Sequence, residues 1–188
     1  MKTNLLLSIV LFISSSVFAQ TWTLDKAHAK LGFTVTHLLV SDVEGKFKVF
    51  DINITSSKDD FTDASVDLSA DINSISTDND YRDNDLKSEK FFNAKQFPTL
   101  SFKSTSLKKT DAKNYKLNGN LTMHGITKPV ELDVILNGVI QNPMNKKNVA
   151  GFKIKGVVKR SDFGIGASTP GAIVSDDVTI DANVELDK

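Results

Sequence analysis

The stretch VTIDANVEL, residues 178–186, alternates an apolar with a polar side chain at every position. Successive side chains of a β-strand point to opposite faces, whereas the apolar residues of a helix recur every three or four positions. This stretch therefore predicts a strand with one face on an apolar interior and the other in water. That arrangement is typical of antiparallel sheets.

The same alternation recurs along the chain, in residues 31–36, 66–72, 117–123, 130–136 and 152–159. Three further segments also read as strands: 21–25, 45–55 and 99–107. Roughly eight or nine strands in one domain of ordinary size favour a closed barrel or a sandwich.

One segment departs from the period of two. Thr77, followed three residues later by Asp80, reads as the start of a helix, and acidic residues fill the first turns. Lys87 and Lys90 follow near the end, which suits the helix dipole, and Pro98 prevents continuation. We therefore expect one short α-helix at about 79–92, packed over an end of the sheet.

Asn-Gly pairs at residues 118–119 and 137–138 are each compatible with a hairpin turn. The alternation runs unbroken through residues 117–123, which favours a continuous strand in which Gly119 faces inward. An inward glycine leaves room for a ligand or marks a bend. At residues 137–138 turn and strand are equally compatible with the sequence, and a turn is expected at 124–127.

Residues 1–19 have the three parts of a secretory signal peptide. Lys2 is followed by an apolar run over 5–13, and Val17-Phe18-Ala19 precedes a predicted cleavage after Ala19. The apolar run is shorter than the roughly 20 residues that a membrane span needs, so we expect no stable membrane insertion. Residues 20–188 are then one exported domain, periplasmic or secreted.

Composition excludes several classes of function. The formal net charge is +0, so there is no electrostatic case for nucleic acid as a partner. The absence of cysteine excludes thiol chemistry and thiolate metal sites. His28, His37 and His124 show no metal-ligand spacing, and no nucleophile elbow, phosphate loop or metalloprotease motif is present. We expect no metal, no cofactor and no catalytic residue.

The histidines divide by position. His37 shares the inward phase of Phe33 and Val35 at a strand end, so it serves either as a ligand contact or as a hydrogen-bonded structural residue. His124 lies at a turn, where a structural role is the default. His28 opens a strand and fits a structural or a rim position equally well.

Arg82 either forms a local ion pair with Asp83, which is worth little if exposed, or meets an anionic group at a barrel mouth. Arg160 begins RSDFG, residues 160–164, where a strand leaves into a tight loop and Asp162 is expected to cap backbone donors. The glycine-rich loop 164–171 is the expected mobile segment and a possible gate.

Several motifs together resemble the YceI-like family, and the resemblance spans essentially all of residues 20–188. The most specific are LTMHGITKP at 121–129 and RSDFG at 160–164. The others are, in order, WTLDKAH at 22–28, Phe33, His37, Gly45-Lys46-Phe47, Ser76-Thr77, RDNDL at 82–86, Phe91-Phe92, Phe97-Pro98, Phe102 and VSDDV at 174–178.

This resemblance implies an antiparallel, eight-stranded, lipocalin-like β-barrel whose apolar tunnel holds a polyisoprenoid or a similar long-chain lipid. It also implies a periplasmic or secreted protein and makes a homodimer plausible. Two positions depart from the family pattern: Ala29 replaces a frequent Ser, and Asp85 replaces a frequent His. An acidic Asp85 opposes an anionic headgroup and favours a neutral one, such as a quinone, an alcohol or an amide.

A closed barrel of about eight strands is either filled by its own side chains or hollow enough for one ligand. Strand phase predicts an apolar lining of Phe33, Val35, Phe47, Leu68, Phe102, Leu121, Met123, Val134 and Ile154. His37 and Arg82 are the expected headgroup contacts.

Two alternatives to a lipid carrier stay open at this point. One is an enzyme of isoprenoid or quinone chemistry that uses His37 or His124, and it needs a carboxylate within hydrogen-bond reach of that histidine. The other is a stress or interaction protein with a solidly packed barrel. A continuous internal tunnel would argue against the second.

Overall fold

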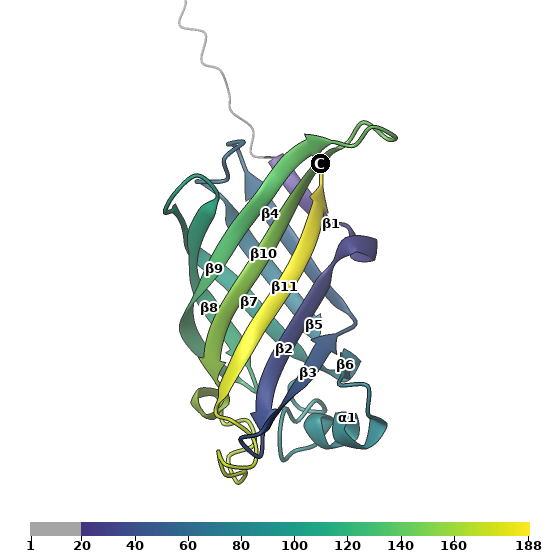
Figure 1. Ribbon diagram of the computed structural model, residues 1–188, viewed down its shortest axis with the longest axis vertical. Helices are drawn as coiled ribbons and strands as arrows, with labels where there is room; N and C mark the ends of the chain where they lie inside the picture. The colour runs from purple at the N-terminus through teal and green to yellow at the C-terminus, as the bar shows by residue number, and fades with distance from the viewer. Residues whose placement is uncertain (1–19) are drawn as a thin grey trace, which may run out of the picture.

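Strands account for most of residues 20–188, the part of the chain that the computed structural model describes (Figure 1). The strands are β1 Gln20–Leu24, β2 Lys30–His37, β3 Ser41–Phe47, β4 Phe50–Ser56, β5 Ser65–Asp71, β6 Ile75–Ser76, β7 Thr99–Lys109, β8 Asn114–Met123, β9 Ile126–Gln141, β10 Asn148–Lys159 and β11 Asp177–Asp187. The helical elements are α1 Asp80–Lys87 and three 3₁₀ turns, η1 Lys26–His28, η2 Ile72–Ser74 and η3 Arg160–Phe163.

Eight of the strands form a closed antiparallel barrel in the order β1-β4-β5-β7-β8-β9-β10-β11. The ring closes because β1 pairs with both β4 and β11, through Thr23 opposite Asp187 and Leu24 opposite Leu186. After η1 the chain continues as β2 along another part of β11, and β3 and β6 extend the same sheet beyond β2. The prediction of a mainly antiparallel eight-stranded barrel with one short helix is confirmed.

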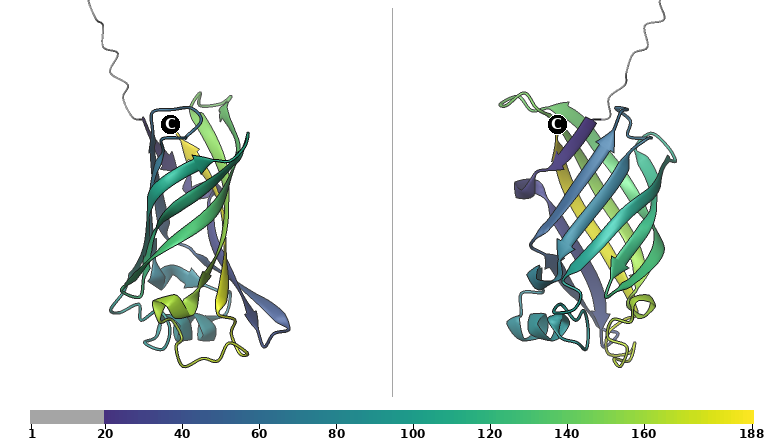
Figure 2. Two further views of the ribbon diagram at one scale, coloured as in Figure 1. Left: turned by 90° about the vertical axis from the view of Figure 1, so that its left-hand side faces the viewer. Right: turned by 180° about the vertical axis from the view of Figure 1, so that it is seen from behind.

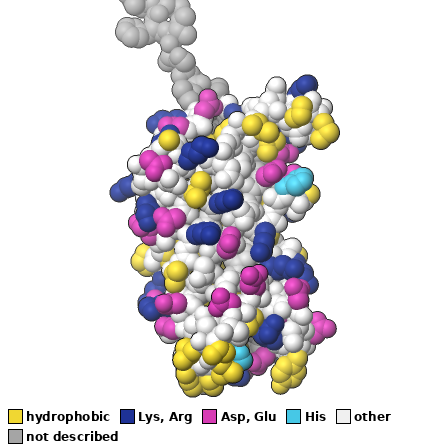
Figure 3. Space-filling view, in the orientation of Figure 1, with side chains coloured by type: hydrophobic (Ala, Val, Ile, Leu, Met, Phe, Trp, Pro, Cys, Tyr) yellow, Lys and Arg dark blue, Asp and Glu magenta, His cyan; other side chains and the backbone are white. Residues whose placement is uncertain are grey.

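The two ends of the barrel differ. The start of β1 and the end of β11 lie at one end, whereas α1 and the loop between β10 and β11 lie at the other (Figures 1 and 2). We call these the terminal end and the helical end. The wall between them carries scattered basic and acidic side chains, as the predicted outward faces require (Figure 3).

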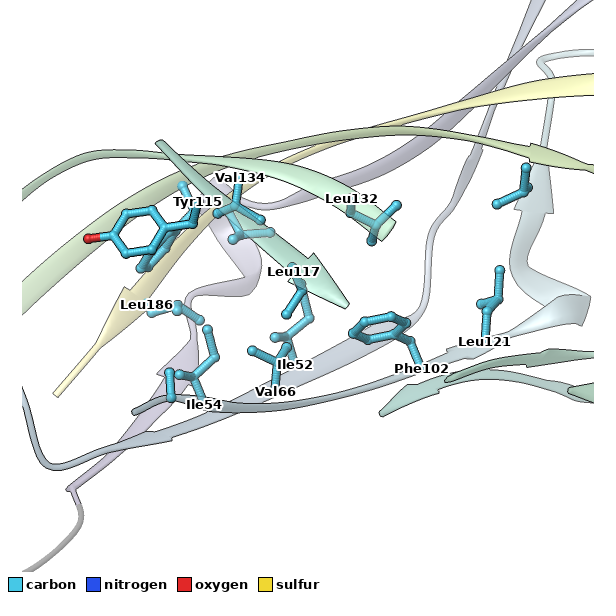
Figure 4. Packing of buried hydrophobic residues seen from close by; sticks show 14 of the residues in the cluster. Ile52, Ile54, Val66, Phe102, Tyr115, Leu117, Leu121, Leu132, Val134 and Leu186 are labelled. Atoms are coloured by element: carbon cyan, nitrogen blue, oxygen red, sulfur yellow. The ribbon is translucent and has the colours of Figure 1, made fainter. Parts of the chain in front are cut away.

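Aromatic side chains fill the interior at the terminal end. The β4–β5 loop places Phe61 there, only 1% exposed, with ring centroids 5.2 Å from Trp22 and 5.1 Å from Phe152. Tyr115 lies close by, and its hydroxyl donates to the Asp60 carbonyl at 2.8 Å. In Figure 4 Tyr115 gathers with other buried residues at one part of the cluster, while Phe102 lies farther along. These rings plug one end of the barrel.

The segment 45–55, predicted as one strand, is two strands that meet at a corner. The amides of Lys48 and Val49 donate to the carbonyl and the hydroxyl of Ser74, and Asp71 N donates to the Val49 carbonyl. These bonds satisfy the backbone at the bend, so β3 and β4 need not be collinear. The short strand β6, which pairs with β3, has no signal in the alternation.

The predicted helix 79–92 is shorter than expected and begins with a different cap. Asn79, not Thr77, is the N-cap, and its side chain accepts from Arg82 N at 3.0 Å. The helix ends at Lys87 because Ser88 has an extended backbone and its hydroxyl donates to the Asp85 carbonyl. The following residues form turns before β7.

The turn expected at 124–127 is confirmed as a tight connection of β8 and β9. His124 and Gly125 both have positive φ, which is the backbone that a tight hairpin of this kind requires. Residues 118–119 lie within β8, as predicted, and residues 137–138 prove to lie within β9. The predicted signal peptide, residues 1–19, lies outside the described residues.

Gly119 faces inward, but the space beside it is occupied. A Cβ built there would lie 2.3 Å from the Phe102 ring and 2.6 Å from the Lys103 carbonyl oxygen. Its partner strand β7 carries an irregularity between Ser104 and Ser106 at this level. Gly119 therefore marks a bulge and admits the Phe102 ring.

Within residues 20–188, no helix combines the length and hydropathy needed to cross a bilayer.

The two Asn-Gly pairs provide a matched test of this packing. We expect Gly119→Ala to lower the free energy of unfolding by about 1–3 kcal/mol, because the new methyl overpacks against Phe102 and backbone. Gly138→Ala should change it by no more than about 0.5 kcal/mol, since nothing lies within 4 Å of a Cβ at that position. Urea unfolding of the purified protein measures both. Equal effects of the two substitutions would contradict the inward packing of Gly119.

Candidate functional site

The barrel encloses a cavity of about 430 Å³ with an overwhelmingly apolar wall. This volume lies in the range of pockets that bind small molecules. The wall includes every residue that strand phase predicts as lining, together with both expected headgroup contacts: Phe33, Val35, His37, Phe47, Leu68, Arg82, Phe102, Leu121, Met123, Val134 and Ile154. Contact of these side chains with a ligand stays a prediction.

Several side chains that point into the barrel are not covered by side chains from the opposite wall. Leu68, Ile154 and Ile180 come from three different strands and all face inward, yet each is only half-buried. Their uncovered surface borders the cavity. Covering such apolar surface with another apolar molecule removes it from water, which lowers the free energy.

The polar side chains on the cavity wall all come from the helical end. They are His37, Thr77, Arg82, Asp85, Lys90, Arg160 and Thr169. The plugged terminal end contributes Phe61, Ile54 and Phe152 instead. The cavity is therefore amphipathic along its length, with a long apolar part and a polar mouth between α1, the β2–β3 hairpin and the loop before β11.

Arg82 is fixed at this mouth by Thr77. Its Nε donates to Thr77 Oγ1 at 2.7 Å and its Nη2 to the Thr77 carbonyl at 2.9 Å. The predicted Arg82–Asp83 ion pair is wrong: no such pair occurs in the described chain. The two residues have separate bonds to Thr77, because helical geometry points adjacent side chains in different directions.

Asp83 holds Thr77 in the position that binds Arg82. Its Oδ1 accepts from the Thr77 amide at 2.7 Å and from the Thr77 hydroxyl at 2.6 Å, and the residue is 7% exposed. Burial acts to raise the pKa of Asp83, but the two hydrogen bonds from Thr77 outweigh it and hold the pKa below its usual value. A carboxylate is thus kept charged beneath the mouth, where it positions Thr77 and, through it, Arg82.

Arg160 is 6% exposed and bonds entirely to backbone. Its guanidinium donates to five carbonyl oxygens, those of Ile165, Gly166, Thr169, Val174 and Ser175. These bonds leave it committed to the loop rather than to an anion. The loop 164–171, predicted as mobile and as a gate, is anchored here, and any opening motion has to break this clamp.

A neighbouring expectation needs correction. Asp176, not Asp162, satisfies the start of this loop: it accepts from Ser161 N at 3.0 Å and from Ser161 Oγ at 2.8 Å. Asp162 is exposed and lies within η3. Asp176 lies just before β11, fifteen positions after Ser161, and the folded chain brings the two residues together. The turn residues around Ser161 give no sign of this contact.

The three histidines have three different surroundings. His37 ends β2, bridges to Val174 and lies on the cavity wall. His124 is structural, since its Nδ1 lies 2.9 Å from the Phe163 carbonyl and its ring packs edge-on to Phe97.

His28 lies on the outer wall, near Asp25 and Glu185. Its Nδ1 is 2.9 Å from Asp25 Oδ2, and this hydrogen bond raises the pKa of His28. The Asp25, His28 and Glu185 ligand atoms lie within 4.8 Å of one another, a grouping that sequence spacing did not reveal. None of the three residues borders the cavity.

Asp85, which the family resemblance associates with the headgroup, borders the cavity. Sequence reasoning missed several other mouth residues. Lys90 also borders the cavity, and its Nζ lies 3.4 Å from Asp85 Oδ2. Thr169, Ile173 and Val174 border it from the loop before β11. Loop residues carry no alternation, so no strand phase could place them.

Comparisons with known proteins agree with this geometry. Residues 22–186 match the YceI-like domain. A UPF0312 protein of Staphylococcus aureus (strain bovine RF122 / ET3-1) is 36% identical over 169 residues, which cover 88% of this chain and 96% of that protein. The crystal structure of a Campylobacter jejuni YCEI protein is 34% identical, covers 88% of this chain and 96% of its own, and superposes with a TM-score of 0.72.

A more distant structure shares the fold. It is a polyisoprenoid binding domain from Saccharophagus degradans, implicated in plant cell wall breakdown, with 14% identity and a TM-score of 0.64. The match covers 88% of this chain and 97% of that one.

The Arg160 clamp predicts a specific instability. Lysine has three donors and no planar fork, so Arg160→Lys leaves buried carbonyls unpaired and should lower the free energy of unfolding by about 1–3 kcal/mol. Amide hydrogen exchange over residues 164–174 should accelerate more than elsewhere. Lys159→Met is the control, because Lys159 forms only exposed ion pairs, the shorter with Asp177. Unchanged exchange in the Arg160 variant would show that the loop does not depend on the clamp.

Proposed function

Because this chain belongs to the YceI-like domain family, we propose that it is a non-catalytic binding protein that carries or stores one long-chain lipid. The observation that carries the proposal is the apolar cavity with its polar groups gathered at one end. A polyisoprenoid or a similar chain would lie along the barrel, with its headgroup at the mouth. The polyisoprenoid binding domain of S. degradans, which has the same fold, supports this ligand class.

The energetics favour a long apolar chain. Each buried CH₂ contributes about 0.8 kcal/mol, so a tail inside the barrel needs few polar contacts to bind tightly. The half-buried Leu68, Ile154 and Ile180 supply surface that such a tail would cover. Selectivity would then come from the length of the cavity and from the residues at its mouth.

The mouth suits a neutral or weakly polar headgroup. Arg82 is engaged by Thr77, and the charge of Lys90 is offset by Asp85. His37 offers a ring nitrogen that can donate or accept a hydrogen bond. A quinone, an alcohol or an amide would bring no negative charge close to Asp85.

Export of the protein is part of the proposal. Residues 1–19 have the features of a signal peptide, and the described domain starts with β1 at Gln20. Intact mass of the protein purified from its native host should correspond to a chain that starts at Gln20. A chain that retains Met1–Ala19 and stays in the cell would contradict export.

The rival functions have less support. A solidly packed barrel conflicts with the cavity. An enzyme using His37 or His124 needs a carboxylate beside that histidine, and among the described residues the histidine–carboxylate pairs are those of His28 on the outer wall. The cavity therefore supports binding better than it supports catalysis.

The deciding experiment is organic extraction of purified protein followed by mass spectrometry. We expect a long-chain isoprenoid, quinone or acyl lipid at about one per chain. Protein that is empty, and that also takes up none of these lipids from dispersion, would contradict the proposal and favour an interaction protein.

Blocking the cavity should abolish that occupancy. Ile154→Trp places a large ring on the inward face of β10, whereas Val157→Trp places one on the outward face of the same strand, where Val157 is 58% exposed. We expect the first variant to lose bound lipid and the second to retain it. Circular dichroism establishes that both are folded. Full occupancy in folded Ile154→Trp protein would place the lipid outside the barrel.

A further inference from the structure

The hairpin between β2 and β3 ends in three large apolar residues that face solvent. Leu38, Leu39 and Val40 are 53%, 70% and 82% exposed. No charged residue lies among residues 38–41. Such a run at a protruding tip is unusual for a protein in water, because isolated apolar residues are common on surfaces but contiguous ones mark interaction sites.

The backbone of this turn is also unfavourable for its sequence. Leu38 and Leu39 both have positive φ, in the left-handed region that Gly and Asn adopt more readily. Folding alone would be served better by those smaller or polar residues. The leucines are therefore costly at this position both in conformation and in exposed surface.

The apolar tip is continuous with the cavity mouth. Leu38 N donates to the Ile173 carbonyl at 3.0 Å, and His37 bridges to Val174 beside it. Ile173 is itself 44% exposed and also borders the cavity. In Figure 3 hydrophobic side chains gather at the helical end, where Figure 1 places the β2–β3 turn and the loop before β11. An apolar path thus leads from the tip into the barrel.

We propose that the tip 38–40 inserts into the surface of a neutral lipid bilayer, so that the cavity mouth opens against the membrane. A long-chain lipid could then pass between bilayer and cavity along Ile173 without crossing water. This inference rests on the proposed lipid-binding function and adds the surface from which the lipid is taken or to which it is delivered.

A bilayer fits this surface better than a second protein. Three side chains on a convex turn are far from the ~800 Å² per partner that a stable protein interface buries. The charged groups around the mouth have both signs, with Lys90 paired to Asp85 and Arg82 bound to Thr77. Binding should therefore depend on apolar insertion, need no anionic lipid and change little with salt.

The chain offers a matched control at the opposite end of the barrel. The β9–β10 hairpin exposes Val139, Ile140 and Met144 by 43%, 64% and 88%. This hairpin lies at the terminal end, away from the mouth (Figure 1). It tests whether any exposed apolar hairpin binds vesicles or only the one beside the cavity.

The experiment compares Leu39→Asn/Val40→Asn with Ile140→Asn/Met144→Asn in the full exported chain. Asparagine tolerates left-handed backbone, so the first variant should fold. Phosphatidylcholine vesicles containing a long-chain prenol serve as donor, and flotation and the rate of prenol transfer are measured. We expect at least roughly tenfold weaker vesicle binding and slower transfer for the mouth variant, and wild-type values for the control.

Loading from ethanol-dispersed prenol separates the two proposals. If the mouth variant loads as wild type from dispersion but transfers slowly from vesicles, docking is supported. If wild-type protein loads from dispersion but neither floats with vesicles nor differs from the variant in transfer, docking is overturned while lipid binding stands. If wild-type protein never loads, the proposed function fails. Concentration-dependent dimers that the mouth substitutions abolish would assign the tip to a second copy instead.

Discussion

Closure of the sheet by β1 and β11 is the constraint on which the molecule depends. Only a short ladder makes it, with Leu24 opposite Leu186 and Thr23 opposite Asp187. No disulfide can reinforce it, because the chain has no cysteine. Closure gives β1 and β11 a partner on each side and turns the inward faces of the eight strands toward a common interior. The apolar side chains that alternate along residues 178–184 thereby line the cavity.

The two ends of the barrel solve different problems. At the terminal end Phe61 and Trp22 exclude water by packing aromatic rings into the opening. At the helical end polar side chains hold irregular backbone in place, Arg160 through five carbonyls and Asp83 through Thr77. Buried polar groups that are fully bonded give rigidity without closing the opening. The barrel is thus closed by aromatic side chains at its terminal end and open at its helical end, where polar side chains surround the mouth.

Period-two alternation was enough to predict which side chains of each strand face inward, whereas the choice of a barrel over a sandwich came from the family resemblance. Phe33 and Ile154, for example, lie on the cavity wall as their strands require. The mouth could not be predicted in the same way. Arg82 bonds to the Thr77 carbonyl five positions away and Arg160 to the Thr169 carbonyl nine positions away, and such contacts with irregular backbone follow no period. The early end of α1 at Lys87 likewise reflects local bonds of Ser88.

A hollow barrel is less stable than a filled one of the same size, because the side chains around the void lack packing partners. Leu68 and Ile180 remain half-buried for this reason. A ligand that binds only the folded state returns that free energy as binding, and its contribution grows with the logarithm of its concentration over Kd. The apolar cavity wall thus lowers the stability of the protein alone, and the same wall would favour binding of the proposed long apolar chain.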